Sequence, residues 1–103
     1  MGGPARGGKP RSELAALRGV GPSLARDLEA LGVRRVEELA GRDPEALYRR
    51  LCALTGERQD RCVLYVFRCA VYQASHARPD RALCDWWAWK EGGLASRRGA
   101  HPC

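Results

Sequence analysis

The chain has 103 residues, of which 45% are hydrophobic, and a formal net charge of +6 at pH 7. This length allows one compact domain, and the hydrophobic fraction is ordinary for a globular protein, which excludes wholesale disorder. Residues 12–93 carry 13 of the basic and all 12 acidic side chains, so this part of the chain is close to neutral. Charge alone therefore gives little support to a nucleic-acid partner.

The two ends of the chain are rich in Gly, Pro and Arg. Residues 1–11 predict a flexible basic tail and residues 94–103 a second flexible tail, with a folded domain over 12–93. The first tail lacks the apolar run of a secretory signal. The longest apolar run, residues 62–72, covers about half of the roughly 20 residues that cross a bilayer. The sequence therefore predicts a cytoplasmic protein without a membrane partner.

Between the tails the apolar spacing is helical almost throughout. Ser12 can cap a short first helix, which the turn at residues 19–21 ends. Pro22 suits the first position of a second helix, because its missing N–H would be unpaired there in any case. Gly32 stops this helix.

The helical pattern continues to about residue 90. A short third helix forms around residues 36–39, and Asp43 caps a fourth helix. Residues 58 to about 76 predict the longest helix, which is apolar on nearly every side. A last helix over residues 81 to about 90 contains three tryptophans. We predict an all-α fold, in which a tandem hairpin unit packs on a long apolar helix and a C-terminal Trp-rich helix.

An internal repeat connects the first four helices. The matching pairs, at a spacing of 22 or 23 residues, are Leu14 with Val36, Leu17 with Leu39, Gly19 with Gly41, Pro22 with Pro44, Leu28 with Leu51 and Leu31 with Leu54. We therefore predict two copies of one unit, an apolar helix, a glycine turn and an apolar helix that begins with proline.

The first copy, residues 14–32, resembles the helix-hairpin-helix motif of DNA repair and recombination proteins. Its Leu-x-x-Leu lead-in, its Gly-Val-Gly turn, the alanine six residues after Gly19 and the closing Leu-Gly carry the resemblance. Both glycines can adopt positive φ and let a phosphate approach the backbone closely. The following helix N-terminus offers unpaired N–H groups and a partial positive charge. A proline often precedes the first glycine of this motif, where this chain has Arg18.

The expected DNA-binding residues are Arg18, Gly19, Val20, Gly21, Ser23, Leu24 and Arg26. The backbone N–H groups of Gly21, Ser23 and Leu24 are the expected donors to phosphate, and the two arginines can pair with adjacent phosphates. Such contacts hold the DNA backbone without reading bases, so binding would be independent of sequence and sensitive to salt. The alternative is that the turn only connects two core helices.

The second copy differs at one decisive position. Asp43 stands where the first copy has its second glycine, and its carboxylate is expected to accept hydrogen bonds from the helix amides. Those donors would then be occupied, and a negative charge would face an incoming phosphate. We expect the second hairpin to be structural.

Three further segments carry a resemblance to one family. These are Asp43-Pro44-Glu45, Asp60-Arg61-Cys62 and Trp86-Trp87-x-Trp89-Lys90. Together they make residues 12–91 similar to the bacterial helix-hairpin-helix proteins of the pathogenicity-locus and mitomycin-resistance family. The resemblance implies association with DNA, in repair or damage resistance, and implies no particular reaction.

The five cysteines form no C-x-x-C pair. Cys62 and Cys69 are seven residues apart on one helix, about 10 Å along its axis, so they cannot share a zinc ion. We expect the cysteines to pack in the core, with metal binding and redox sensing as alternatives. The tryptophans can stack on unpaired bases, but we favour a core or lid role, and an exposed one would mark a protein interface.

Three classes of function remain after these observations. No Ser/His/Asp set, P-loop or H-E-x-x-H motif is present, so we predict no catalytic residue, no metal and no cofactor. The favoured hypothesis is a non-catalytic, sequence-independent DNA-binding protein. The alternative is a helical adaptor that docks on a DNA-processing protein, and an enzyme is the third class.

Overall fold

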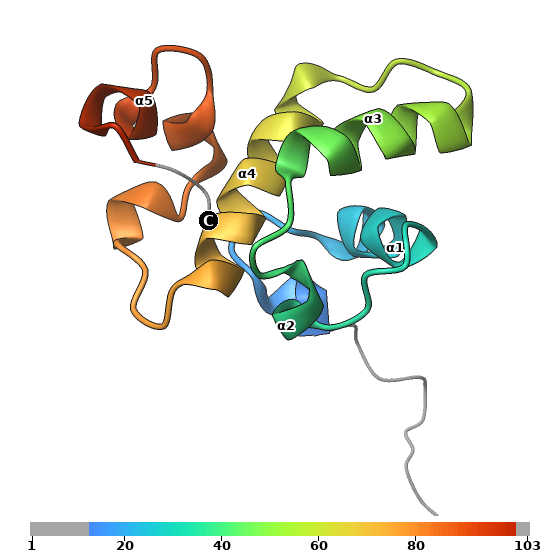
Figure 1. Cartoon of the computed structure of the whole chain (residues 1–103), viewed down its shortest axis with the longest axis horizontal. Helices are drawn as coiled ribbons and strands as arrows, with labels where there is room; N and C mark the ends of the chain where they lie inside the picture. The colour runs from blue at the N-terminus through green and yellow to red at the C-terminus, as the bar shows by residue number, and fades with distance from the viewer. Residues whose placement is uncertain (1–12, 101–103) are drawn as a thin grey trace, which may run out of the picture.

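A computed structural model describes residues 13–100, and every regular element in this range is a helix (Figure 1). The elements, with η for 3-10 helices, are η2 Glu13–Ala16, α1 Pro22–Ala30, α2 Val36–Leu39, α3 Pro44–Thr55, α4 Arg61–Ser75, η3 Arg81–Leu83, η4 Trp86–Trp89 and α5 Leu94–Arg98. The all-α prediction is confirmed over these residues. Both Ser12, the predicted first cap, and the predicted basic tail at residues 1–11 lie outside the described range.

Helix α4 lies at the centre of the arrangement (Figure 1). In this view α1, α2 and α3 lie on one side of it, and η3, η4 and α5 lie on the other. The buried residues of α4 are Leu64, Val66, Phe67, Cys69, Ala70, Val71 and Tyr72. Because these side chains occupy several faces of one helix, α4 contributes to both halves of the core.

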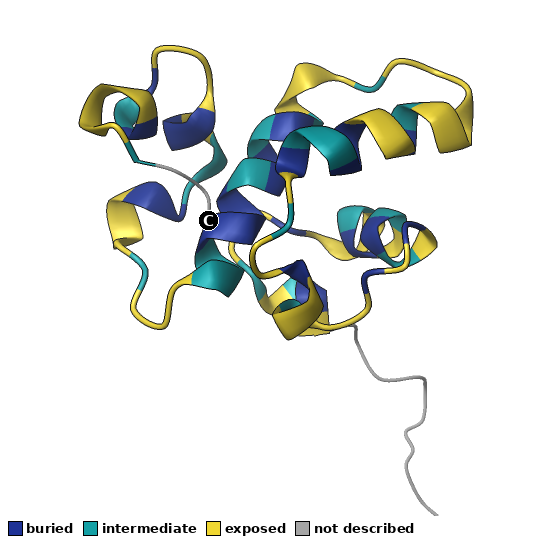
Figure 2. Ribbon diagram, in the orientation of Figure 1, coloured by how far each residue is buried: buried dark blue, intermediate teal, exposed yellow. Residues whose placement is uncertain are grey.

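The core has two clusters, which correspond to these two sides of α4. The larger cluster joins α4 to the repeat segments and includes Leu14, Leu28, Leu47 and Phe67, each at most 1% exposed. The smaller cluster joins α4 to the C-terminal segments, and Trp89 is its largest member. The exposed residues of α3 gather toward its C-terminal end (Figure 2).

The helix boundaries follow local signals in the sequence. Asp43 and Asp60 precede α3 and α4, and each carboxylate accepts a hydrogen bond from an N–H group in the first turn. Gly32 and Gly56 follow α1 and α3 with φ near +91° and +75°, the left-handed conformation in which glycine carries no Cβ penalty. The predicted ends of these helices are therefore confirmed to within a few residues.

Three predictions about the second half are wrong. First, α4 is the longest helix of the described residues, as predicted, but it begins at Arg61, has 15 residues and is not apolar on nearly every side. Its Arg61 and Cys62 are exposed, and Arg68 is only partly buried. In the described residues, no helix combines the length and the hydropathy that crossing a membrane requires.

Second, the predicted Trp-rich helix over 81–90 is two 3-10 turns, η3 and η4, separated by Cys84 and Asp85. Asp85 has an extended backbone, with ψ 137°, which interrupts any continuous helix. Third, the predicted tail from residue 94 contains α5, whose Ala95 is buried in the smaller cluster. The tertiary contacts of this alanine order a segment whose composition predicts a flexible end.

Candidate nucleic-acid interface

Two glycine turns of the same geometry connect the helices of the two repeats. Gly19 and Gly41 both have positive φ, +88° and +74°. In each turn, the residue after the glycine donates its N–H to the carbonyl oxygen of a leucine three residues before it, at 3.1 Å. The amides four residues after Gly21 and Asp43 donate back to those two residues, at 2.9 and 3.1 Å. The repeat in the sequence is thus also a repeat of backbone conformation.

Helix α1 begins without a side-chain cap. The N–H groups of Gly21, Ser23 and Leu24 have no acceptor within residues 13–100, and Gly21 and Ser23 are exposed. A Cβ added at Gly21 would meet nothing within 4 Å, so the space beside these amides is open. Three backbone donors at the positive end of a helix dipole therefore have no partner among the described residues.

The two glycines of this turn differ in conformation. Gly21 has φ −87° and ψ 179°, an extended conformation that any residue adopts. Gly21 therefore does not use the positive φ that glycine allows, and in this turn only Gly19 needs the freedom of glycine. What Gly21 contributes is the absence of a side chain beside the open amides.

One of the equivalent donors of the second turn is occupied, the N–H of Glu45, which corresponds to Ser23 in the repeat. In addition, the N–H of Gly41, which corresponds to Gly19, donates to Ser75 Oγ at 2.9 Å. The Glu45 N–H donates to Asp43 Oδ1 at 3.0 Å. The prediction that Asp43 caps its own helix is confirmed, and this N-terminus presents a carboxylate where α1 presents free amides.

The Arg18 side chain is hydrogen-bonded to a residue that lies outside the first glycine turn and its flanking helices. Its Nε donates to Asp85 Oδ1 at 2.5 Å, and this hydrogen bond raises the pKa of Arg18 above its ordinary value. The Arg18 side chain is 59% exposed, and its Nη1 and Nη2 donors form no bond with the described residues. Arg18 is therefore a positioned cation, whose charge is partly compensated by the Asp85 carboxylate.

The backbone of the turn is fastened to α4 through one glutamine. Gln73 Oε1 accepts the Arg18 N–H at 3.0 Å, and Gln73 Nε2 donates to the Arg18 carbonyl oxygen at 2.9 Å. Sequence reasoning missed Gln73 and Asp85 because both lie more than 50 positions away from Arg18. The only signal for Asp85 was its place beside the tryptophan motif.

The structure places the remaining predicted residues in different surroundings. Val20 is 3% exposed and its N–H is bonded to Leu17, so it anchors the turn and offers no contact to a ligand. Leu24 packs against the larger core cluster, which leaves only its amide available. Ser23 and Arg26 are exposed and lie three residues apart, on one face of α1.

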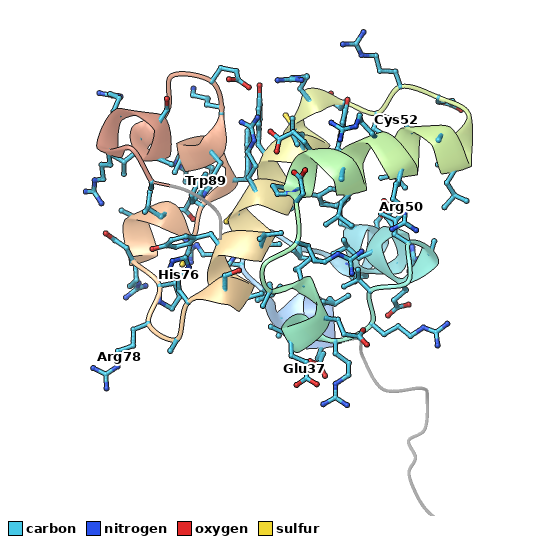
Figure 3. The ribbon with its side chains drawn as sticks, in the orientation of Figure 1. Glu37, Arg50, Cys52, His76, Arg78 and Trp89 are labelled. Atoms are coloured by element: carbon cyan, nitrogen blue, oxygen red, sulfur yellow. The ribbon has the colours of Figure 1, made fainter. Side chains whose placement is uncertain are left out.

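Among the described residues, the cysteines and His76 form no metal site. Cys69 is fully buried, its thiol donates to the Cys84 carbonyl oxygen at 2.8 Å, and burial raises its pKa to about 12. His76 and Trp89 both lie beside the ring of Tyr72 (Figure 3). Within residues 13–100, no three His, Cys, Asp or Glu side chains are grouped as metal ligands would be.

Comparison with known proteins supports the family resemblance that the sequence motifs indicate. Residues 9–93 match the family model described as Cdd1, pathogenicity locus. The chain is 41% identical over 78 residues to the mitomycin resistance protein McrB of Streptomyces lavendulae, an alignment that covers 74% of this chain and 69% of that relative. No solved structure matches the chain significantly. Since the matched region spans both glycine turns, α4 and the tryptophan motif, the chain belongs to the Cdd1 pathogenicity-locus family.

Proposed function

We propose that this protein is a non-catalytic, sequence-independent DNA-binding protein that holds a backbone phosphate at the N-terminus of α1. In this proposal the two glycine turns are a tandem helix-hairpin-helix unit, of which the first copy alone binds DNA. One observation carries it: α1 has free amides at its N-terminus, whereas Asp43 and Asp60 cap α3 and α4. An uncapped helix N-terminus beside a glycine is a favourable site for phosphate.

The neighbouring side chains suit the same ligand. The Ser23 hydroxyl can donate beside the amides, and Arg26 on the same face can reach the next phosphate along a strand. Arg18 offers its two free Nη groups from the other end of the turn. None of these groups reads a base edge, so we expect little preference among sequences.

The charges around the site limit the expected affinity. Helix α1 also carries Asp27 and Glu29, and Asp85 lies against Arg18. We therefore expect few net phosphate contacts and a shallow dependence of binding on salt. The name of the McrB relative refers to mitomycin resistance, and we carry over damage resistance as the proposed setting.

The decisive variant is Gly21→Asp, which gives the first turn the cap of the second. The extended backbone and open space at Gly21 accept an aspartate without strain. Its carboxylate would occupy the amides and repel phosphate, so we expect binding to fall at least about tenfold for every sequence. Fluorescence anisotropy with labelled duplexes of unrelated sequence measures this, and circular dichroism verifies the helix content.

Two controls separate the hairpin from general charge. Asp43→Asn keeps a capping oxygen on the second turn and should leave DNA binding unchanged. Replacing Arg6, Lys9 and Arg11 by serine in the full chain should weaken binding and flatten its salt dependence without abolishing it. If Gly21→Asp binds as the unaltered protein does, or if binding vanishes with the basic tail alone, the first hairpin is only a structural turn.

A further inference from the structure

Trp87 is exposed although the two tryptophans beside it are largely covered. Its side chain is 52% exposed, whereas Trp89 is 4% exposed and donates its Nε1–H to the Leu83 carbonyl oxygen. Trp86 is partly buried and packs against the larger core cluster. Among the large hydrophobic side chains of residues 13–100, only Leu54 on α3 is comparably exposed. Exposing an indole costs hydrophobic stabilisation, so its position on the surface needs a reason.

The exposed indole rests on a layered aromatic support. The ring of Trp87 meets that of Trp86 at 79°, with centroids 5.8 Å apart. Trp86 is parallel to Tyr65 of α4 within 3°, with centroids 6.4 Å apart. The guanidinium groups of Arg61 and Arg68 lie 5.8 and 5.6 Å from the Tyr65 centroid. Trp87 therefore packs edge-on against Trp86, which in turn stacks on Tyr65 of α4.

This support is linked to the candidate phosphate site through the pairing of Arg18 with Asp85. Asp85 lies two residues before Trp87 and accepts the hydrogen bond of Arg18, and Arg18 lies three residues before Gly21. The hydrogen bond from Arg18 to Asp85 therefore links the segment that carries Trp87 to the turn before α1.

The acidic groups of this surface are paired with arginines, Asp85 with Arg18 and Glu91 with both Arg61 and Arg68. Lys90 after η4 is exposed and forms no ion pair with the described residues. The surface combines an aromatic face, paired charges, one unpaired lysine and open amides.

We propose that Trp87 stacks on an unpaired base of the DNA strand whose phosphate the α1 N-terminus holds. The proposal rests on the proposed function and adds the substrate class, which is single-stranded DNA. A base in a continuous duplex already has a neighbour on each face, so an exposed indole gains a partner only where a base is unstacked. Surfaces that bind single strands combine aromatic faces, on which bases stack, with positively charged groups that hold the backbone.

The test compares one single-stranded oligothymidylate with a blunt duplex of the same length, using the full chain. Trp87→Ala should weaken binding to the single strand at least about fivefold, the lower end for loss of base stacking. Its duplex affinity should stay within about twofold, because the hairpin is untouched. Leu54→Ala, which removes the other exposed large side chain, is the matched control and should change neither affinity.

Two further measurements distinguish a loss of base stacking from a loss of folding. Trp87→Tyr retains an aromatic face, so it should keep most of the single-strand affinity even if alanine disturbs folding. Addition of the single strand should quench tryptophan fluorescence in the unaltered protein, and Trp87→Tyr should lose most of that quenching.

The other possible outcomes would contradict the stacking proposal alone or both proposals. Equal losses for single strand and duplex, or an effect of Leu54→Ala as large as that of Trp87→Ala, would show that Trp87 is no base-stacking platform. If Trp87→Ala leaves the single-strand affinity unaltered, Trp87 is no base-stacking platform, while the proposal that the first hairpin binds phosphate is unaffected. If the unaltered protein binds neither DNA, both proposals fail, and Trp87 then belongs to a protein interface.

Discussion

The two glycines of the first turn perform different tasks, although the sequence presents them as one motif. Gly19 has φ +88°, a conformation that side chains with a Cβ rarely adopt. Gly21 has an ordinary extended φ, and a methyl group attached to its Cα would have no neighbouring atom within 4 Å. Folding therefore requires glycine at the first position, whereas at the second position it leaves the helix amides uncovered.

Alanine at each position should separate these tasks. We expect Gly19→Ala to lower the free energy of unfolding by about 1–2 kcal/mol, because its backbone is left-handed. Gly21→Ala should stay within about 0.5 kcal/mol of the unaltered protein, as for an unstrained surface change. Urea denaturation of the two variants measures the difference. Similar losses at both positions would contradict the conformations described for this turn.

At the scale of elements, aspartates define where the later helices begin. Asp60 accepts the Cys62 N–H at 2.8 Å, and this bond lowers the pKa of Asp60. Asp80 before η3 accepts the Ala82 N–H at 2.9 Å and pairs with Arg98 of α5, and both contacts lower its pKa. Each aspartate thus favours the folded state while it is ionised.

These pKa values predict the direction of acid destabilisation. A carboxyl group whose pKa is lower in the folded than in the unfolded chain stabilises the fold above the unfolded pKa, near 4. That contribution is lost as the pH falls through the folded pKa. We expect the melting temperature to drop between about pH 4.5 and pH 2.5. Asp60→Asn, which keeps an acceptor without the charge, should melt lower at pH 7 but show a smaller drop.

The control for this series is an acidic residue without such a role. Glu57→Gln changes an exposed carboxylate in the loop before Asp60 and should leave the pH profile as it is. An Asp60→Asn profile parallel to that of the unaltered protein would mean that the cap carries no pH-dependent stability.

At the scale of the whole molecule, the C-terminal segments complete the domain around α4. Arg68 of α4 donates to the Trp89 carbonyl oxygen at 2.8 Å and pairs with Glu45 of α3, so it connects both sides of the helix. The family match ends at residue 93, yet α5 follows directly and buries Ala95. Folding of residues 94–98 is therefore coupled to the domain that the family shares.

A buried glycine makes this coupling testable. A Cβ at Gly93 would lie 2.7 Å from the Ala88 carbonyl oxygen and 2.9 Å from that of Trp87. Because both are backbone atoms, Gly93→Ala should push α5 away from η4 and lower the free energy of unfolding by about 1–3 kcal/mol. Ser96→Ala, an exposed change on α5, is the control and should have little effect. Chemical denaturation followed by tryptophan fluorescence measures both, and an unaffected Gly93→Ala would show that α5 is not packed there.

The sequence by itself determined the elements whose signals are local. Proline at the first position of α1 and α3, aspartate caps and glycines after helix ends act within a few residues, so the boundaries of these helices and the repeat could be predicted. The open amides of the first turn and the capped Glu45 amide of the second followed from a single difference, Gly21 against Asp43.

Only the tertiary structure decided the features that depend on distant partners. Leu31 and Leu54 are equivalent in the repeat, yet the first is 5% and the second 58% exposed, because the other elements cover only one of them. The pairing of Arg18 with Asp85, the break between η3 and η4 and the burial of α5 also arise from segments far apart in the chain. Burial and ion pairing are properties of the packed surfaces, which no window of neighbouring residues contains.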